Sequence, residues 1–242
     1  MEATNPERQL SAPEVVRLIG HELGNRLGVL SNSVYYLNLR LGDGDEKLAR
    51  HLHLISQEIT ASSRILANLM DWIGPKEPMR EELQPNALVE QLGARNQPHA
   101  SLEFITTLAE DLPPVYGDAA QLGRALGNLI AYEYTLLPEG GQLGISTSRE
   151  GPWVVLCLQD TEPPFTPDQA AQLLDLLPDG LFSPVQLGLV VAHNLLAANG
   201  CELVIAQTDD LPWRFRVLIP SSQGERVSEL ARGYHAKNDG SN

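Results

Sequence analysis

Two consecutive segments near the start of the chain carry apolar residues in a seven-residue rhythm. In each segment the apolar positions alternate steps of four and three residues, which is the seam of a helical bundle and not the wider stripe of a surface helix. The first seam consists of Val16, Gly20, Leu23, Leu27, Leu30, Val34, Leu37 and Leu41, and the second of Leu48, Leu52, Ile55, Ile59, Ser62, Leu66, Leu69 and Ile73. The pattern predicts two long helices.

The two predicted helices are joined by a short turn and together form a hairpin. Residues 42–45 read Gly-Asp-Gly-Asp, whose glycines supply backbone angles that other residues resist, and Gly74-Pro75 ends the second helix. Residues 11–73 are therefore expected to form an antiparallel helical hairpin. Because two helices cannot shield both sides of such seams from water, we expect two hairpins to pair into a four-helix bundle, as a homodimer.

The chain changes character after a short linker at residues 74–79. Residues 80–220 alternate helix and strand signals, which predicts a second domain with a mixed sheet and helices on one face. Strands are expected near 102–108, 143–147, 153–159, 202–206 and 213–219, and helices near 85–92, 118–136, 167–177 and 185–198. The whole chain is predicted to be α+β, with the second domain an α/β sandwich. The polar tail, 221–242, is expected to be mobile.

Composition narrows the function classes. The chain has 17 basic and 31 acidic residues, a net charge of -14, which opposes binding to nucleic acid or to an anionic membrane surface. It has no apolar run of about eighteen residues and no signal-like start, so a cytoplasmic protein is expected. The two cysteines, Cys157 and Cys201, have no metal or redox spacing.

His21, Glu22 and Asn25 are the candidate catalytic residues. With the first seam buried, they fall on its flank or outside it, and His21 and Asn25 lie one turn apart on the same helical face. A neutral imidazole is nucleophilic near physiological pH, and Glu22 could orient it and accept its proton. Asn25 could hold a water or a phosphoryl oxygen. These residues predict a phosphate carried on His21, whereas the simpler alternative is a polar surface histidine.

Residues 11–220 resemble the transmitter core of sensor histidine kinases. The first helix in that family carries a His-Glu-x-x-Asn motif, matched here by His21, Glu22 and Asn25. Where a family member usually has Arg and Pro, this chain has Gly24 and Arg26. Loss of the proline should leave the helix straighter and is expected to alter which partner fits beside His21.

The second domain resembles the ATP-binding half of that family, with altered motifs. Residues 118–132 follow its Asn-rich helix through Asn128, but the magnesium-binding Asn falls at Tyr132, and a phenol is a poor ligand for Mg²⁺. The Asp-x-Gly-x-Gly motif keeps Asp160, which could still accept a hydrogen bond from an adenine amine. Glu162 and Pro164 replace its glycines.

The last glycine motif, at residues 184–189, keeps only Gly188 of its three glycines. Phosphate cradles need close backbone approach and free amide donors. The resemblance therefore implies a remnant nucleotide site at Asn128, Asp160 and Gly188 and no metal site. No cofactor is expected, and ATP with Mg²⁺ would bind only if the divergent site still works.

Three functions remain open from the sequence. The first, which we favour, is a histidine phosphotransferase or pseudokinase that exchanges phosphate between His21 and the aspartate of a response-regulator receiver domain. The second is an active ATP-dependent histidine kinase with a divergent nucleotide site. The third is a non-catalytic dimeric scaffold that binds a response regulator.

Overall fold

The computed structural model forms two compact units, Met1–Lys76 and Glu77–Asn242. It describes residues 12–41, 46–74, 76–95, 103–137, 141–160, 165–166, 169, 173, 184–205 and 214–222. Most of the helix expected near 167–177, the altered positions Glu162 and Pro164, and the tail beyond residue 222 lie outside the described residues.

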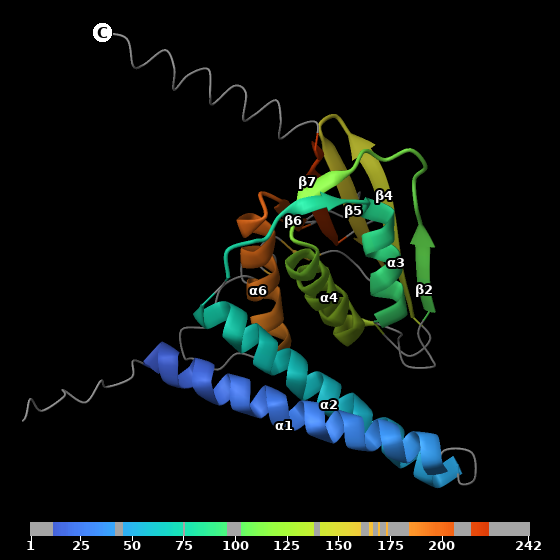
Figure 1. Ribbon diagram of the computed structural model, residues 1–242. Helices are drawn as coiled ribbons and strands as arrows, with labels where there is room; N and C mark the ends of the chain where they lie inside the picture. Colours follow the sequence, from blue (N-terminus) through green and yellow to red (C-terminus); the bar gives the residue numbers. More distant parts are fainter. Residues whose placement is uncertain are drawn as a thin grey trace, which may run out of the picture. The chain divides into compact units, whose positions relative to one another are not determined.

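The first unit is a hairpin of two long helices, α1 (Ala12–Leu41) and α2 (Glu46–Ile73) (Figure 1). Both predicted helices are present. Their contact is apolar, with Val34, Leu52 and Ile59 buried and Leu27 and Leu48 packed beside them. The hairpin is therefore held by the seams that the sequence indicates.

Only part of each seam is buried within one hairpin. Leu23, Leu30 and Leu37, spaced seven residues apart on α1, are 46%, 52% and 40% exposed, and Ile55 on α2 is 47% exposed. A row of apolar side chains that are each 40% or more exposed is uncommon on a helix pair that stays alone in water. At Gly20 the helices approach so closely that a Cβ would overlap the Met70 thioether. Gly20 therefore fixes how α1 packs on α2 one residue before His21.

The second unit contains a mixed five-stranded sheet in the order β2-β4-β5-β7-β6. The elements along the chain are β1 (Glu81–Leu83), α3 (Pro85–Arg95), β2 (Glu103–Thr107), β3 (Val115–Gly117), α4 (Ala119–Leu136), β4 (Gln142–Glu150), β5 (Trp153–Gln159), α6 (Pro184–Ala198), β6 (Glu202–Ile205) and β7 (Phe215–Pro220). Strands β2 and β4 are parallel, and the remaining neighbours are antiparallel. The predicted α+β class and mixed sheet are confirmed.

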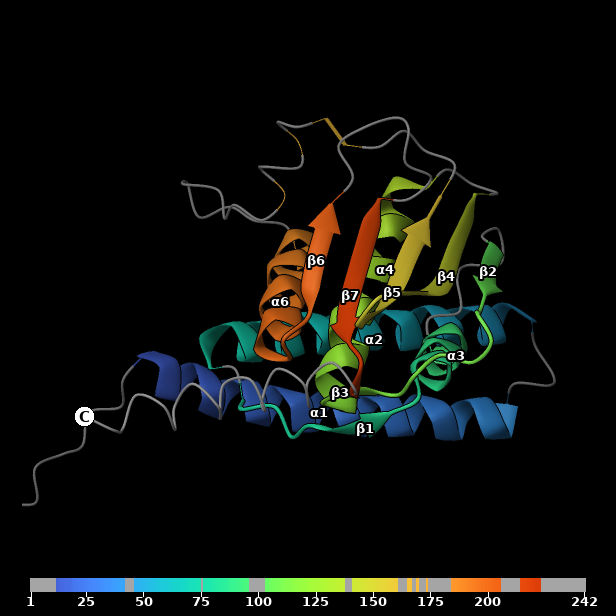
Figure 2. The ribbon, with the colours of Figure 1, turned by 90° about the horizontal axis from the view of Figure 1, so that it is seen from above.

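The helices α3, α4 and α6 lie on the same side of this sheet (Figures 1 and 2). Alternate strand residues face them and are buried. These residues are Leu143, Ile145, Val154, Leu156, Leu158, Phe215, Val217 and Ile219. The alternation is what a sheet covered on one face requires, and it places the main hydrophobic core between the sheet and the helices.

Two short strands were missing from the sequence prediction. β1 and β3 pair antiparallel as a separate two-stranded sheet, with Glu81 opposite Gly117 and Leu83 opposite Val115. Each has three residues, too few for an alternating pattern to be recognised. Their existence depends on this long-range pairing and not on local sequence.

The start of α4 is tied to the end of α6. The Asp118 carboxylate caps α4 by accepting hydrogen bonds from the backbone amides of Ala120 and Gln121, at 2.9 and 3.0 Å. Burial raises the pKa of Asp118, but these amides, with that of Met79, outweigh burial and lower the pKa overall. The side-chain amide oxygen of the buried Asn199 accepts a hydrogen bond from the Asp118 backbone amide at 2.8 Å, and the Asn199 side-chain nitrogen donates to Gln121.

In the part of the chain that the structure describes, no helix is long and apolar enough to cross a membrane.

Candidate functional site

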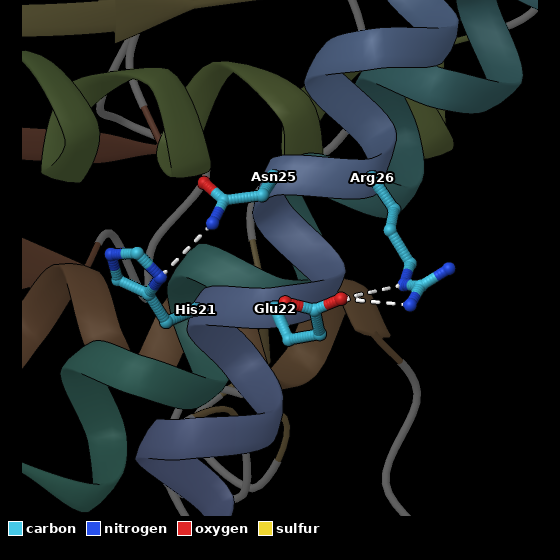
Figure 3. Close-up of polar contacts among 4 residues, drawn as sticks. All are labelled: His21, Glu22, Asn25 and Arg26. Atoms are coloured by element: carbon cyan, nitrogen blue, oxygen red, sulfur yellow. Dashed lines mark hydrogen bonds and ion pairs between the residues drawn. The ribbon is translucent and has the colours of Figure 1, made fainter.

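His21 lies on α1 with its side chain exposed, and Asn25 contacts it from one turn further along (Figure 3). The Asn25 amide nitrogen Nδ2 lies 3.2 Å from the ring nitrogen Nδ1 of His21. This contact engages one ring nitrogen and leaves Nε2 on the side away from Asn25. The imidazole is therefore both oriented and accessible.

Glu22 pairs with Arg26 (Figure 3), whereas the sequence predicts that Glu22 orients the His21 imidazole. The Arg26 Nε donates to Glu22 Oε1 at 2.9 Å, and a second guanidinium nitrogen lies 2.8 Å from the same oxygen. Both side chains are largely exposed. The physical reason is helical spacing, since residues four apart share a face, while adjacent residues such as His21 and Glu22 point about 100° apart. Arg26 stands where the family resemblance has proline, so the pair is a consequence of that substitution.

The three residues of the expected nucleotide remnant all lie in the second unit. Asn128 is buried on α4, Gly188 is buried in α6, and Asp160 directly follows β5. Among them, Asp160 is the one that the structure places in a charged contact. Its side chain is 1% exposed.

Asp160 faces a buried arginine. Arg214 Nε lies 3.2 Å from Asp160 Oδ2, and Arg214 Nη1 lies 4.0 Å from Glu133 Oε2. The Arg214 side chain is 7% exposed and that of Glu133 is 1% exposed. Burial, together with the neighbouring Asp160 carboxylate, raises the pKa of Glu133 well above its ordinary value, although Arg214 opposes the shift. We refer to Arg214, Asp160 and Glu133 as the buried charge cluster.

A group of aromatic rings packs against one side of this cluster. The Arg214 guanidinium lies over the Phe165 ring, 5.1 Å from its centroid. The rings of Phe165, Phe215 and Tyr132 pack on one another with centroids 5.7 to 6.2 Å apart. Tyr132, at the position of the family's magnesium ligand, is thus part of an apolar contact. Among the described residues, no group of three or more His, Cys, Asp or Glu side chains could hold a metal ion.

Sequence reasoning missed Glu133 and Arg214. One signal was available for Glu133, because it continues the buried stripe of α4 through Leu126, Leu129 and Ile130 at helical spacing. A charged residue on such a stripe indicates a buried partner. Arg214 gave no comparable signal, since its partner is set by how β5 pairs with β7.

No model of a known protein family matches the chain. The sequence is similar to sensor histidine kinase ZraS of Escherichia coli O157:H7, with 20% identity over 224 residues, covering 90% of this chain and 48% of ZraS. It is also similar to sporulation kinase B of Bacillus subtilis (strain 168), with 24% identity over 193 residues, covering 78% of this chain and 45% of that kinase. The chain thus spans about half the length of these relatives.

Solved structures with the same fold are also histidine kinases. Full-length ShkA in complex with AMPPNP matches with a TM-score of 0.60 and 18% identity, over 88% of this chain and 47% of that one. The Acinetobacter baumannii histidine kinase AdeS matches with a TM-score of 0.51 and 20% identity, over 84% of this chain and 98% of that one. Together, the sequence relatives support a histidine kinase transmitter core with an ATPase-like domain, and the solved structures show the same fold.

Proposed function

We propose that this chain is a phosphorelay protein in which His21 exchanges a phosphoryl group with the aspartate of a response-regulator receiver domain. The observation that carries the proposal is the exposed His21 imidazole, held at Nδ1 by Asn25 and open at Nε2. A histidine that served only as a polar surface residue would not need this orientation.

The transfer uses the free ring nitrogen. The Nε2 lone pair attacks phosphorus of the receiver's acyl phosphate, a P–N bond forms, and the P–O bond breaks with its electron pair leaving on the aspartate carboxylate. For this attack the ring proton resides on Nδ1 and stays there while the P–N bond forms, and the Asn25 amide, turned by half a rotation so that Oδ1 faces the ring, accepts a hydrogen bond from Nδ1–H. The Nδ1 proton then passes to water, either directly or by way of the Glu22 carboxylate when Glu22 is released from Arg26, which leaves a neutral ring carrying the phosphoryl group.

Phosphate in this proposal does not come from ATP. The Asp160 carboxylate lies in the buried charge cluster, and Tyr132 packs against Phe165 and Phe215 where a magnesium ligand would be needed. ShkA was solved with AMPPNP, but that finding describes ShkA. The residues present here do not fit a magnesium nucleotide, so no step is assigned to one.

The proposed assembly is a homodimer that docks a receiver beside His21. The outward seam residues Leu23, Leu30, Leu37 and Ile55 are the surface that a second hairpin would cover. The net charge of -14 argues against nucleic acid and anionic membranes as partners.

Phosphotransfer from receivers tests the proposal directly. Response-regulator receivers of the same cell are charged with radiolabelled acetyl phosphate and mixed with the full chain. Label that is acid-labile and base-stable should appear on the wild type, because a phosphoramidate behaves that way. His21→Ala should abolish it, whereas the matched control His53→Ala, an exposed histidine on α2, should keep it.

Two other outcomes would favour the remaining candidates. A receiver that binds wild type and His21→Ala equally, with no transfer from any receiver, would indicate a scaffold. Incorporation of label from ATP onto His21 would instead indicate an active kinase.

A further inference from the structure

Strand pairing brings the charged groups of the second unit together. β5 and β7 run antiparallel with Leu158 opposite Phe215, so the end of β5 lies beside the start of β7. Asp160 follows β5, and Arg214 precedes β7 and donates its backbone amide to the Leu158 carbonyl at 3.0 Å. Glu133 reaches the same point from the buried face of α4. Three separate elements therefore supply the buried charge cluster.

The cluster pairs a buried cation with a buried anion, Arg214 with Asp160, while both Glu133 carboxyl oxygens make no hydrogen bond among the described residues. One guanidinium faces two carboxyl groups, all almost completely buried, and an ion removed from water in this way is costly unless it is paired. Asp160 gains a charge-assisted contact from Arg214 that a neutral amine could not match. An adenine amine that approached Asp160 would have to displace the guanidinium and leave it buried without its counter-ion.

The space around Asp160 is also filled. The Arg214 guanidinium stacks on Phe165, which is 8% exposed, and Phe165 packs on Phe215. A flat base needs an open apolar slot beside its polar anchor. The arginine head and the rings fill the side of Asp160 that the structure describes.

We propose that the buried charge cluster takes the place of a nucleotide in this domain, with Arg214 as the internal partner of Asp160 and the adenine position closed. This inference rests on the proposed function, because it gives the reason why phosphate on His21 comes from a receiver and not from ATP.

The first test is a titration of the full chain with a fluorescent ADP, mant-ADP, with and without Mg²⁺. The wild type should show no saturable binding up to about 1 mM, and Asp160→Asn should change nothing. Saturable micromolar binding by the wild type that Asp160→Asn weakens about tenfold would overturn the inference, since Asp160 would then be reachable.

The second test opens the cluster. A Glu133→Ala/Arg214→Ala double variant should bind mant-ADP at least about tenfold more tightly than the wild type, and adding Asp160→Asn should remove the gain. The matched control is Arg216→Ala, because Arg216 lies two residues along the same chain segment but pairs with Glu150. A folded double variant that binds no better than the wild type would contradict the inference.

A variant that retains the side-chain volume guards against misfolding. If circular dichroism shows that the double alanine variant is unfolded, Glu133→Gln/Arg214→Met removes the cation and the second carboxylate with little loss of volume, and the same gain is expected. Phosphotransfer to His21 is measured on every sample. If the wild type binds nucleotide through Asp160 and still accepts phosphate from a receiver, the inference that the adenine position is closed is overturned and the proposed function stands. If the wild type accepts no phosphate and binds no nucleotide, the proposed function is overturned and the inference about the adenine position stands.

Discussion

The Glu22 carboxylate has two candidate partners at the residue scale, the Arg26 guanidinium that it contacts and the His21 imidazole beside it in sequence. The observed pair is exposed and four residues apart, which makes it worth roughly 0.5 kcal/mol or less. So weak a pair can be broken without harm to the helix. Arg26 therefore controls how often Glu22 is available to accept a proton near His21.

We expect Arg26→Ala to raise the rate of phosphoryl transfer. The gain should be about twofold, because releasing Glu22 from a pair worth roughly 0.5 kcal/mol changes its free population by about that factor, while the thermal midpoint barely moves. Rapid-quench measurement of label on His21 checks the rate, and Arg26→Lys is the control that keeps the ion pair. If Arg26→Ala leaves the rate unchanged while Glu22→Gln slows it, Glu22 acts from its paired position.

The raised pKa of Glu133 predicts how the free energy of unfolding changes with pH. Because its pKa is raised in the folded chain, unfolding releases a proton, so stability falls as pH rises from about 4.5 until the folded pKa is passed. Glu133→Gln should remove this decline, and the variant should gain on the wild type as pH rises. Urea unfolding at several pH values between 4 and 8 measures the difference, and a constant difference across that range would count against it.

Some residues of the candidate site could be predicted from the sequence, and others could not. His21 and Asn25 follow from helical spacing on an exposed flank, and their contact is local. The pairing of Glu22 with Arg26 is also local. Either His21 or Arg26 could have been the partner of the Glu22 carboxylate, and the four-residue helical spacing favours Arg26. Arg214 and Asp160 are 54 residues apart in the sequence, and they meet because of the register in which β5 pairs with β7.

At the scale of elements, the cap of α4 stabilises the second unit through more than its own helix. Asp118 accepts from two α4 amides and from Met79, and its own amide is bonded to Asn199 at the end of α6. Loss of the carboxylate leaves three backbone donors without this acceptor. The cap is thus shared by three segments.

Asp118→Ala should lower the free energy of unfolding by about 1–2 kcal/mol. The effect should be present at neutral pH and disappear as pH falls through the lowered pKa of Asp118, because a protonated cap accepts less well. Urea denaturation followed by circular dichroism measures it, with Glu90→Ala on the exposed side of α3 as the control. Equal losses in the two variants would show that the cap contributes nothing specific.

Among the described elements, the sequence predicted the long ones and missed the two short strands, while the helix predicted near 167–177 lies mostly outside the described residues. The helices and the five strands of the main sheet carry enough periods of apolar alternation to be recognised, whereas β1 and β3 form only because residues 81–83 and 115–117 meet. End positions shifted by a few residues, as for β4, which extends to Glu150 because its partner β5 pairs that far. Pairing, which is non-local, sets those ends.

At the scale of the whole molecule, the outward half of the hairpin seam predicts association. Leu30→Asp should convert a dimer into monomers, because a second hairpin would have to bury an unpaired charge. Leu39→Asp is the matched control, since Leu39 is also exposed on α1 but lies outside the seam. Multi-angle light scattering at micromolar concentration checks both, and a monomeric wild type would contradict the dimer.

The order of the units along the chain has a consequence for biosynthesis. The hairpin precedes the sheet along the chain and leaves the ribosome before it, whereas the sheet must wait for β7 to pair with β5 and for β2 to pair with β4, whose residues Glu103 and Gln142 are 39 positions apart. Each helix forms quickly because its own hydrogen bonds are local, whereas a mixed sheet forms slowly because its strands pair across long stretches of chain. Mutations that slow formation of the sheet should therefore leave α1, the helix that carries His21, already formed.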